Sequence, residues 1–400
     1  MRKQIVGILT LIIILLVVLV SIEWLKVKEE RSIYGMKLSF SDDQQRSFTW
    51  LSGQSYPDSL LQIKPSQESW DNGNVMEQAA WQSVVSNEDV DPVYTYRVEL
   101  DGLEWGQSYN YRVVVNGEII SDEYRFSVAE QQSASFQFIH VTDTQGTTEG
   151  DFKQWGDTLK QSLKQAPNAQ FILHGGDITD DPSNVQQWKW FYHQAPMLSS
   201  LPFLATTGNH ELLNDDAQFF QVQMTFPANG ASGLPNFTSY YSSYQNALFI
   251  FLNTEDDIKK QTKWLEQVLQ YHADQYDWII VSMHRGLYGA SQFKDAEDWE
   301  QLFDQYGVDL VLQGHNHSYS RSFPLRDGKV VDSGEQGTVY VTLNAAGSKL
   351  NDKKKEKNYQ AVAFQNGKSM FGVVEVQGSK LIYSAYDNDG QLLDQFTLAN

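Results

Sequence analysis

Residues 170–177 read QFILHGGD, a short apolar run that is followed at once by two glycines and an aspartate. A run of this length bounded by glycine is typical of a strand buried on both faces. Four other buried-looking runs also end in an oxygen- or nitrogen-bearing ligand type: 136–143 (FQFIHVTD), 202–210 (PFLATTGNH), 278–284 (WIIVSMH) and 308–317 (VDLVLQGHNH). We therefore predict a sheet whose strand ends carry the chemistry.

Amphipathic stretches between these runs predict helices. Apolar residues recur at helical spacing at Trp155, Leu159 and Leu163, and again within 264–269 and 299–306. Buried strands that alternate with helices indicate a layered α/β domain. Strand-like runs return near the C-terminus and could supply a second sheet packed on the first: Thr338–Leu343, Gly372–Val376 and Leu381–Tyr386.

The N-terminal third has a different rhythm, in which apolar and polar residues alternate as they do in half-buried strands. Asp101-Gly102 and Asn116-Gly117 are turn signals between such segments. This pattern predicts an all-β sandwich over 33–130, followed by the α/β domain over 136–400 after the polar segment 130–135. The expected strands of the sandwich are Ser47–Ser52, Ser59–Lys64, Tyr94–Leu100, Ser108–Asn116 and Glu123–Val128.

Composition excludes several classes of partner and site. The formal net charge is −20, and proteins that bind DNA or RNA neutralise phosphates with basic residues, so no nucleic-acid partner is expected. There is no cysteine, which excludes disulfides, thiolate metal sites and a cysteine nucleophile. Any metal must therefore be held by nitrogen and oxygen ligands.

Residues 1–32 are interpreted as a membrane anchor and linker. Arg2 and Lys3 precede the apolar run Ile5–Val20, and no small-residue cleavage site follows it. This favours a retained, single-pass anchor over a cleaved signal peptide. By the positive-inside rule the basic end stays in the cytoplasm, so residues 33–400 are expected outside the cell membrane. Secretion after signal cleavage is the alternative.

The polar residues at the strand ends are the candidate site. Because ligands bind beyond the carboxyl ends of strands in α/β sheets, these residues are expected to converge. A pair of metal ions needs a bridging carboxylate, for which Asp177 is the candidate. The nitrogen and oxygen donors suit iron, manganese or zinc better than copper(I), calcium or magnesium. Four other histidines are expected to be structural: His140, His174, His193 and His272.

The order of these motifs resembles the calcineurin-like metallophosphoesterase superfamily, and in particular the purple acid phosphatases. Its elements are Asp143, Gly176-Asp177, Gly208-Asn209-His210-Glu211, His284-Arg285 and Gly314-His315-Asn316-His317. The segment 97–113 also resembles the fibronectin-III-like domain that precedes the catalytic domain in those enzymes. The resemblance covers residues 35–400.

The resemblance implies a role for each site residue. One metal would be held by Asp143, Asp177 and His317, and the second by Asp177, Asn209, His284 and His315. His210 would bind no metal and would instead steady the transition state or protonate the leaving oxygen.

Two positions depart from the family pattern. Purple acid phosphatases have a tyrosine three residues after the bridging aspartate, where this chain has Asp180. Many other members have a histidine two residues after the first aspartate, where this chain has Gln145. Either Gln145 or water would then complete the coordination of the first metal. The identity of both metals stays open.

We expect metal-dependent hydrolysis of a phosphate ester, on a phosphorylated small molecule or a cell-envelope component. A phosphodiesterase or nucleotidase on the same fold is one alternative. The other is an inactive surface binding module, against which the complete ligand set argues.

Overall fold

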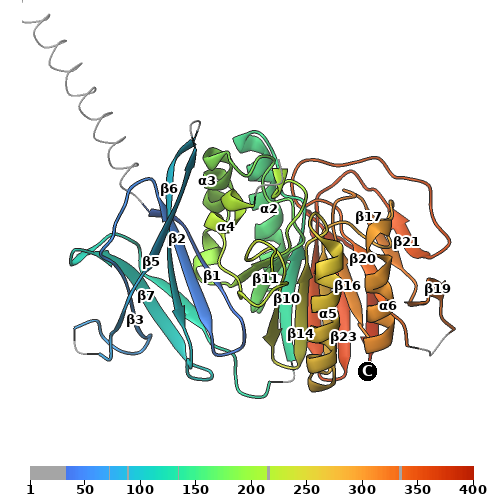
Figure 1. The fold of residues 1–400 in the computed structure, drawn as a ribbon, viewed down its shortest axis with the longest axis horizontal. Helices are drawn as coiled ribbons and strands as arrows, with labels where there is room; N and C mark the ends of the chain where they lie inside the picture. The colour runs from blue at the N-terminus through green and yellow to red at the C-terminus, as the bar shows by residue number, and fades with distance from the viewer. Residues whose placement is uncertain (1–32, 72, 88–89, 134, 214–216, 333–335) are drawn as a thin grey trace, which may run out of the picture.

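The structure is a computed structural model that describes residues 33–400 except 72, 88–89, 134, 214–216 and 333–335 (Figure 1). The predicted membrane anchor falls on residues 1–32 and so lies outside the described residues. Within the described part, no helix is both long enough and apolar enough to cross a membrane.

The N-terminal domain is a sandwich of two antiparallel sheets, which confirms the predicted class. One sheet has the order β1-β2-β6-β5 and the other β4-β3-β7-β8, with β9 paired to β7. Their bounds are β1 Ile33–Ser39, β2 Arg46–Ser52, β3 Ser59–Pro65, β4 Met76–Ala79, β5 Trp81–Asn87, β6 Val90–Leu100, β7 Ser108–Val115, β8 Glu118–Ile119 and β9 Tyr124–Ser127.

Aromatic side chains pack within and between the two sheets. Trp50 stacks on Tyr96 of the same sheet with ring centroids 5.7 Å apart, and Phe48 meets Tyr111 of the other sheet edge-on at 4.9 Å. At the predicted Asn116-Gly117 turn both residues have positive φ, 50° and 80°, as a two-residue hairpin between β7 and β8 requires.

The C-terminal domain contains two large sheets and a small hairpin, β18-β19. The first sheet has the order β12-β11-β10-β22-β23-β24, and the second β13-β14-β15-β16-β20-β17-β21. Their bounds are β10 Ser135–Val141, β11 Phe171–His174, β12 Phe203–Ala205, β13 Tyr240–Tyr244, β14 Ala247–Leu252, β15 Trp278–Met283, β16 Leu310–Gln313, β17 Tyr319–Ser322, β18 Leu325–Arg326, β19 Lys329–Val330, β20 Val339–Thr342, β21 Gln360–Phe364, β22 Met370–Gln377, β23 Lys380–Asp387 and β24 Leu392–Ala399.

The placement of the C-terminal strands corrects the sequence interpretation. Strands β22, β23 and β24 do not form a sheet of their own. Instead, β22 pairs antiparallel with β10 and extends the first sheet, whereas β20 pairs parallel with β16 in the second. Which distant strand β22 pairs with depends on which sheet faces meet in the folded protein. The spacing of apolar residues within a single strand does not contain that information.

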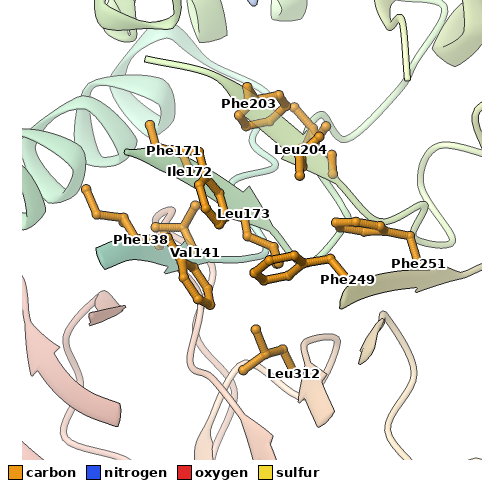
Figure 2. Close-up of a cluster of buried hydrophobic side chains, with 14 of the residues drawn as sticks. Phe138, Val141, Phe171, Ile172, Leu173, Phe203, Leu204, Phe249, Phe251 and Leu312 are labelled. Atoms are coloured by element: carbon orange, nitrogen blue, oxygen red, sulfur yellow. The ribbon is translucent and has the colours of Figure 1, made fainter. Parts of the chain in front are cut away.

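The two sheets pack on each other through the buried side chains drawn in Figure 2. Phe138 and Phe171 of the first sheet stack with ring centroids 4.9 Å apart. Both rings also meet the edge of Phe249 from the second sheet, at 5.5 and 5.3 Å. This contact holds the two sheets face to face.

Helices cover the outer faces of the sheets. Helix α2 begins at a capping box between Thr148 and Asp151, and it buries the predicted Trp155 and Leu159. Helix α6 ends at Gly307, which has a left-handed φ of 70°. The helices are α2 Glu149–Gln165, α3 Val185–Gln194, α4 Gln218–Gln223, α5 Ile258–His272 and α6 Glu297–Tyr306, with 3-10 turns η1 Pro196–Ser199, η3 Ala273–Gln275 and η4 Lys294–Ala296.

Candidate metal centre

The loops after five strands bring the predicted site residues together. Strands β10, β11 and β12 of the first sheet lead to Asp143, Asp177 and Asn209-His210. Strands β15 and β16 of the second lead to His284 and to His315 and His317. The candidate residues from the two sheets thus lie in a single site.

The titratable ligand candidates form two clusters that share one carboxylate. Asp177, His284 and His315 make one cluster, and Asp143, Asp177 and His317 make the other. Asp177 Oδ2 lies 3.0 Å from His284 Nε2, and Asp143 Oδ1 lies 3.1 Å from His317 Nε2. A carboxylate that belongs to both clusters has the position a bridging ligand needs.

Unpartnered buried atoms also fit a metal. Asn209 Oδ1 and Gln145 Oε1 are buried and have no hydrogen-bond partner among the described residues. Buried polar atoms are nearly always paired, so an orphaned oxygen beside two carboxylates and three imidazoles fits a cation ligand. The donor set therefore suits the metals that the sequence predicts.

Several candidate ligands have unusual backbone conformations. The φ angles of Asp143, Asp177, His315 and His317 are 54°, 56°, 67° and 49°, all in the left-handed region. Non-glycine residues seldom adopt this region, and such strain concentrates at functional sites. Gly176 has a φ of 94°, and a Cβ there would stand 2.8 Å from His284 Nδ1, which explains why glycine precedes Asp177.

Backbone carbonyls orient two of the histidines. His284 Nδ1 donates to Gly175 O at 2.8 Å, and His317 Nδ1 donates to Lys349 O at 2.5 Å. In both rings this leaves Nε2 turned towards the carboxylates. A carbonyl that fixes the tautomer is a usual partner of a metal-binding imidazole.

The cluster is electrostatically coupled. Burial disfavours a charged His284, yet Asp177 and Asp143 raise its pKa to about 10. Burial would also raise the pKa of Asp143, but His317 and His284 hold it below its usual range. His315, which lies near Arg285, has its pKa lowered to about 4 by burial and by the neighbouring positive charges. The two carboxylates thus favour positive charge at the centre of the cluster, as a cation site requires.

Comparison with known proteins agrees with this geometry. Residues 136–319 match the calcineurin-like phosphoesterase family, and residues 33–128 match the N-terminal domain of purple acid phosphatases. The chain carries a calcineurin-like metallophosphoesterase domain. The predicted family and fold class are therefore confirmed.

Individual relatives are more distant. The chain is 24% identical over 359 residues to "Probable inactive purple acid phosphatase 1" of Arabidopsis thaliana, covering 77% of this chain and 58% of that protein. It is 24% identical over 279 residues to "Nucleotide pyrophosphatase/phosphodiesterase" of Hordeum vulgare, covering 60% and 75%. The chain spans 50–58% of the length of the first curated relatives it matches.

Among solved structures, the purple acid phosphatase PPD1 of yellow lupin (Lupinus luteus) superimposes with a TM-score of 0.78 at 20% identity, over 92% of this chain and 74% of that one. The structure of PhoD superimposes with a TM-score of 0.63 at 12% identity, over 91% and 92%. Both likenesses show the fold.

His210 lies at the edge of the metallophosphoesterase site and outside both clusters. Its Nδ1 lies 2.6 Å from Asp180 O, so it donates to that carbonyl, and its Nε2 lies 3.9 Å from Asp177 Oδ2. Its side chain is 17% exposed. The ring therefore presents Nε2 to the pocket while Nδ1 is held, which is the geometry of a positioned proton donor.

Glu211 has a role that sequence analysis did not assign. Its buried carboxylate accepts from Asp177 N at 2.8 Å, Ile178 N at 2.7 Å and Gly208 N at 2.7 Å. Burial and the nearby Asp177 raise the pKa of Glu211 to about 7, whereas the N–H donors favour its ionised form. Glu211 belongs to the Gly208-Asn209-His210-Glu211 motif, so the sequence did contain a signal for this residue.

The two departures from the family have different outcomes. Asp180 joins neither ligand cluster, and its carboxylate lies 3.8 Å from His210 Nδ1. Gln145 reaches the site, where its Nε2 lies 3.2 Å from both Asp177 Oδ2 and His317 Nε2. Tyr288, four residues after His284, does not replace the missing tyrosine, because its hydroxyl donates to Glu300 at 2.6 Å and the residue does not line the pocket.

Two of the histidines expected to be structural lie under the site. His140 bonds the Tyr383 hydroxyl, and His174 bonds Thr144 Oγ1, each at 3.0 Å. Burial lowers the pKa of each to about 3, so both are neutral. Neither belongs to the ligand clusters of the described residues.

Proposed function

We propose that this protein hydrolyses phosphate esters at a dinuclear metal site. The observation that carries the proposal is that Asp177 belongs to both ligand clusters, with the orphaned Asn209 Oδ1 beside it. Bound metal ions would supply the positive charge that holds the phosphoryl oxygens and makes the attacking water more acidic. The roles of the ligands follow the division that the family resemblance implies.

His210 would complete the reaction. Its Nδ1–H is held by Asp180 O, so the doubly protonated ring can pass its Nε2 proton to the leaving-group oxygen as the bond between phosphorus and that oxygen breaks, and the neutral ring then takes up a proton from solvent. The new bond forms between phosphorus and the oxygen of water, whose proton passes to solvent. No covalent enzyme intermediate is required.

The test uses the full-length protein with metal analysis and assays on p-nitrophenyl phosphate. Asp177→Asn should lose both metal and hydrolysis. His210→Asn should keep the metal and lower turnover by about 10²–10⁴-fold, the usual range for a positioned acid. Asp298→Asn, on the exposed face of α6, is the control. Wild-type protein without metal-dependent hydrolysis, or a His210→Asn variant without metal, contradicts the proposal.

A phosphodiesterase is the second candidate, since one relative bears the name nucleotide pyrophosphatase/phosphodiesterase. Bis(p-nitrophenyl) phosphate in the same assay separates the two. Three relatives are named as probably inactive; the ligand set of this chain supports activity, because a decayed site would be expected to lose ligands first.

We further propose that the domain lies outside the cell, held by residues 1–32. The basic prefix and the apolar run Ile5–Val20 support this. Protease added to cells without their wall should digest residues 33–400 and leave cytoplasmic proteins intact. Protection of the domain contradicts its location outside the cell. Its release into the medium contradicts a retained anchor.

A further inference from the structure

The pocket over the metal centre has a second half that the proposed reaction does not use. The pocket has a volume of about 240 Å³. Its lining includes four of the candidate ligands, Asp177, Asn209, His315 and His317, together with Gln145 and His210. The remaining lining residues, which make up the second half, are Ser291, Asn316, Lys349, Asn351 and Lys354.

The second half belongs to the most basic segment of an acidic chain. Residues 349–357 contain five lysines and two acidic residues, in a protein of net charge −20. Lys353 pairs with Glu356 at 2.6 Å, but no ion pair is formed by Lys349 or Lys354 with other described residues. Residues 351–358 are exposed, as the run of charged residues predicts for a solvated loop. Lys354 nevertheless lines the pocket.

Hydrogen bonds fix this segment to the metal centre. Lys349 O accepts from His317 Nδ1 at 2.5 Å, and Asn351 N donates to His317 O at 3.2 Å. Asn351 Nδ2 also donates to Asn316 O at 3.1 Å. The start of the basic loop is thus held at a set distance from a candidate ligand.

Asn316 holds one part of the pocket wall in place. Its Oδ1 accepts from Ser291 N at 3.2 Å and from Ser291 Oγ at 2.5 Å, which fixes the orientation of the amide. Its Nδ2 is buried and lies against Gly289, where a Cβ would stand 2.7 Å away, and Gly289 does not line the pocket. The donors that this wall offers to a ligand are therefore Lys349 and Lys354.

We infer that Lys349 and Lys354 form a second phosphate subsite, so that the preferred substrates carry two successive phosphate groups, as a nucleoside diphosphate does. The inference rests on the proposed function. The metal half holds the terminal phosphoryl group that is cleaved, and the basic half holds the next phosphate. The lysines neutralise charge that the metals do not reach.

The test compares ADP with AMP, which share a nucleoside and differ in one phosphate. Phosphate release is measured for the manganese-loaded, full-length wild type and for Lys354→Ala. The variant should lower kcat/KM for ADP about tenfold more than for AMP, mainly through KM. Lys354→Arg should restore most of the difference. Lys355→Ala removes the same charge from the same loop but not from the pocket wall, and it should change the ratio less than about twofold.

A binding measurement separates failure of this inference from failure of the proposed function. Calorimetry with methylenediphosphonate and methylphosphonate should show that Lys354→Ala weakens the diphosphonate selectively, with the metal content of the protein checked after titration. Selective loss in an enzyme without turnover supports the subsite and overturns the reaction. Equal losses for both probes, or equal effects of Lys354→Ala and Lys355→Ala, overturn the subsite while leaving phosphatase activity standing.

Discussion

At the scale of single residues, Glu211 connects two loops of the site. Its carboxylate accepts N–H groups from the loop after β11, at Asp177 and Ile178, and from the loop after β12, at Gly208. The bridging candidate and Asn209 are carried by these loops. Glu211 is therefore a positioning residue, and its effect on the metals passes through the backbone.

Replacing Glu211 by Gln tests this role. The amide has one acceptor oxygen in place of two, so at least one buried N–H loses its partner. We expect a loss of about 1–3 kcal/mol in the free energy of unfolding, and weaker metal retention. Urea unfolding and metal content after dialysis measure the two effects. Glu266→Gln, exposed on α5, is the matched control. A Glu211→Gln protein as stable and as metal-rich as wild type would refute the positioning role.

Asp180 leads to a second prediction at this scale. It occupies the position where purple acid phosphatases have tyrosine, and no tyrosine lines the pocket among the described residues. Protein loaded with iron in air should therefore lack the strong visible band that arises when phenolate binds ferric iron. Asp180→Tyr should introduce it. A band in the wild type that disappears on replacing a single tyrosine would show that a tyrosine reaches the metal from elsewhere.

At the scale of elements, a titratable group also lies at the amino end of a strand, away from the candidate metal centre. Asp309 precedes β16, on the edge opposite the site, and its Oδ2 accepts from Ile279 N of β15 at 2.8 Å. Burial raises the pKa of Asp309 to about 7, although the backbone donors oppose the shift. The protonated carboxyl is therefore favoured in the folded state.

This shift predicts a pH dependence of stability. Because the folded pKa lies above the unfolded value near 3.8, the stabilising contribution is present below the unfolded pKa and is lost as pH rises through about 7. Asp309→Asn keeps the acceptor oxygen and removes the charge. Its melting temperature should match wild type near pH 3.5, below the unfolded pKa, and exceed it by about 2–4 °C at pH 8. Asp298→Asn should show no such divergence. A constant difference at both pH values contradicts this account.

At the scale of the whole molecule, the sandwich packs on the metallophosphoesterase domain, with β1 beside α3 and with β5 and β6 beside α4 (Figure 1). Arg97 of the sandwich reaches across the interface. Its Nη2 donates to Gln221 O at 2.6 Å and its Nε donates to Thr225 Oγ1 at 2.8 Å. Burial lowers the pKa of Arg97 to about 10, and the guanidinium remains charged at neutral pH.

Arg97→Met should uncouple the two domains. Methionine keeps the apolar stem but leaves the carbonyls of Gln221 and Met224 without the guanidinium donor, whereas Thr225 Oγ1 still accepts from Thr49. We expect a loss of about 2–3 kcal/mol and a calorimetric transition that broadens or splits in two. Arg125→Met, exposed on β9, is the control. A single transition at the wild-type temperature would mean that the interface is held by other contacts.

By itself the sequence determined the two fold classes and the members of the site. Alternation over 47–128 indicates a sandwich, and buried runs that end in Asp143, Asp177, Asn209, His284 and His315 indicate the loops that meet. These signals are local, because the period of a strand and the residue that follows it are written within about ten positions. The roles of these residues as metal ligands stay predictions.

Only the tertiary structure decided how distant segments combine. It placed β22 against β10, turned Asp180 towards His210, and brought Lys349 and Lys354 to the pocket over the candidate ligands. It also showed that Glu211 fastens two loops and that Arg97 fastens two domains. Each of these depends on side chains from separate elements meeting in one register, and no local pattern of apolar and polar residues encodes that meeting.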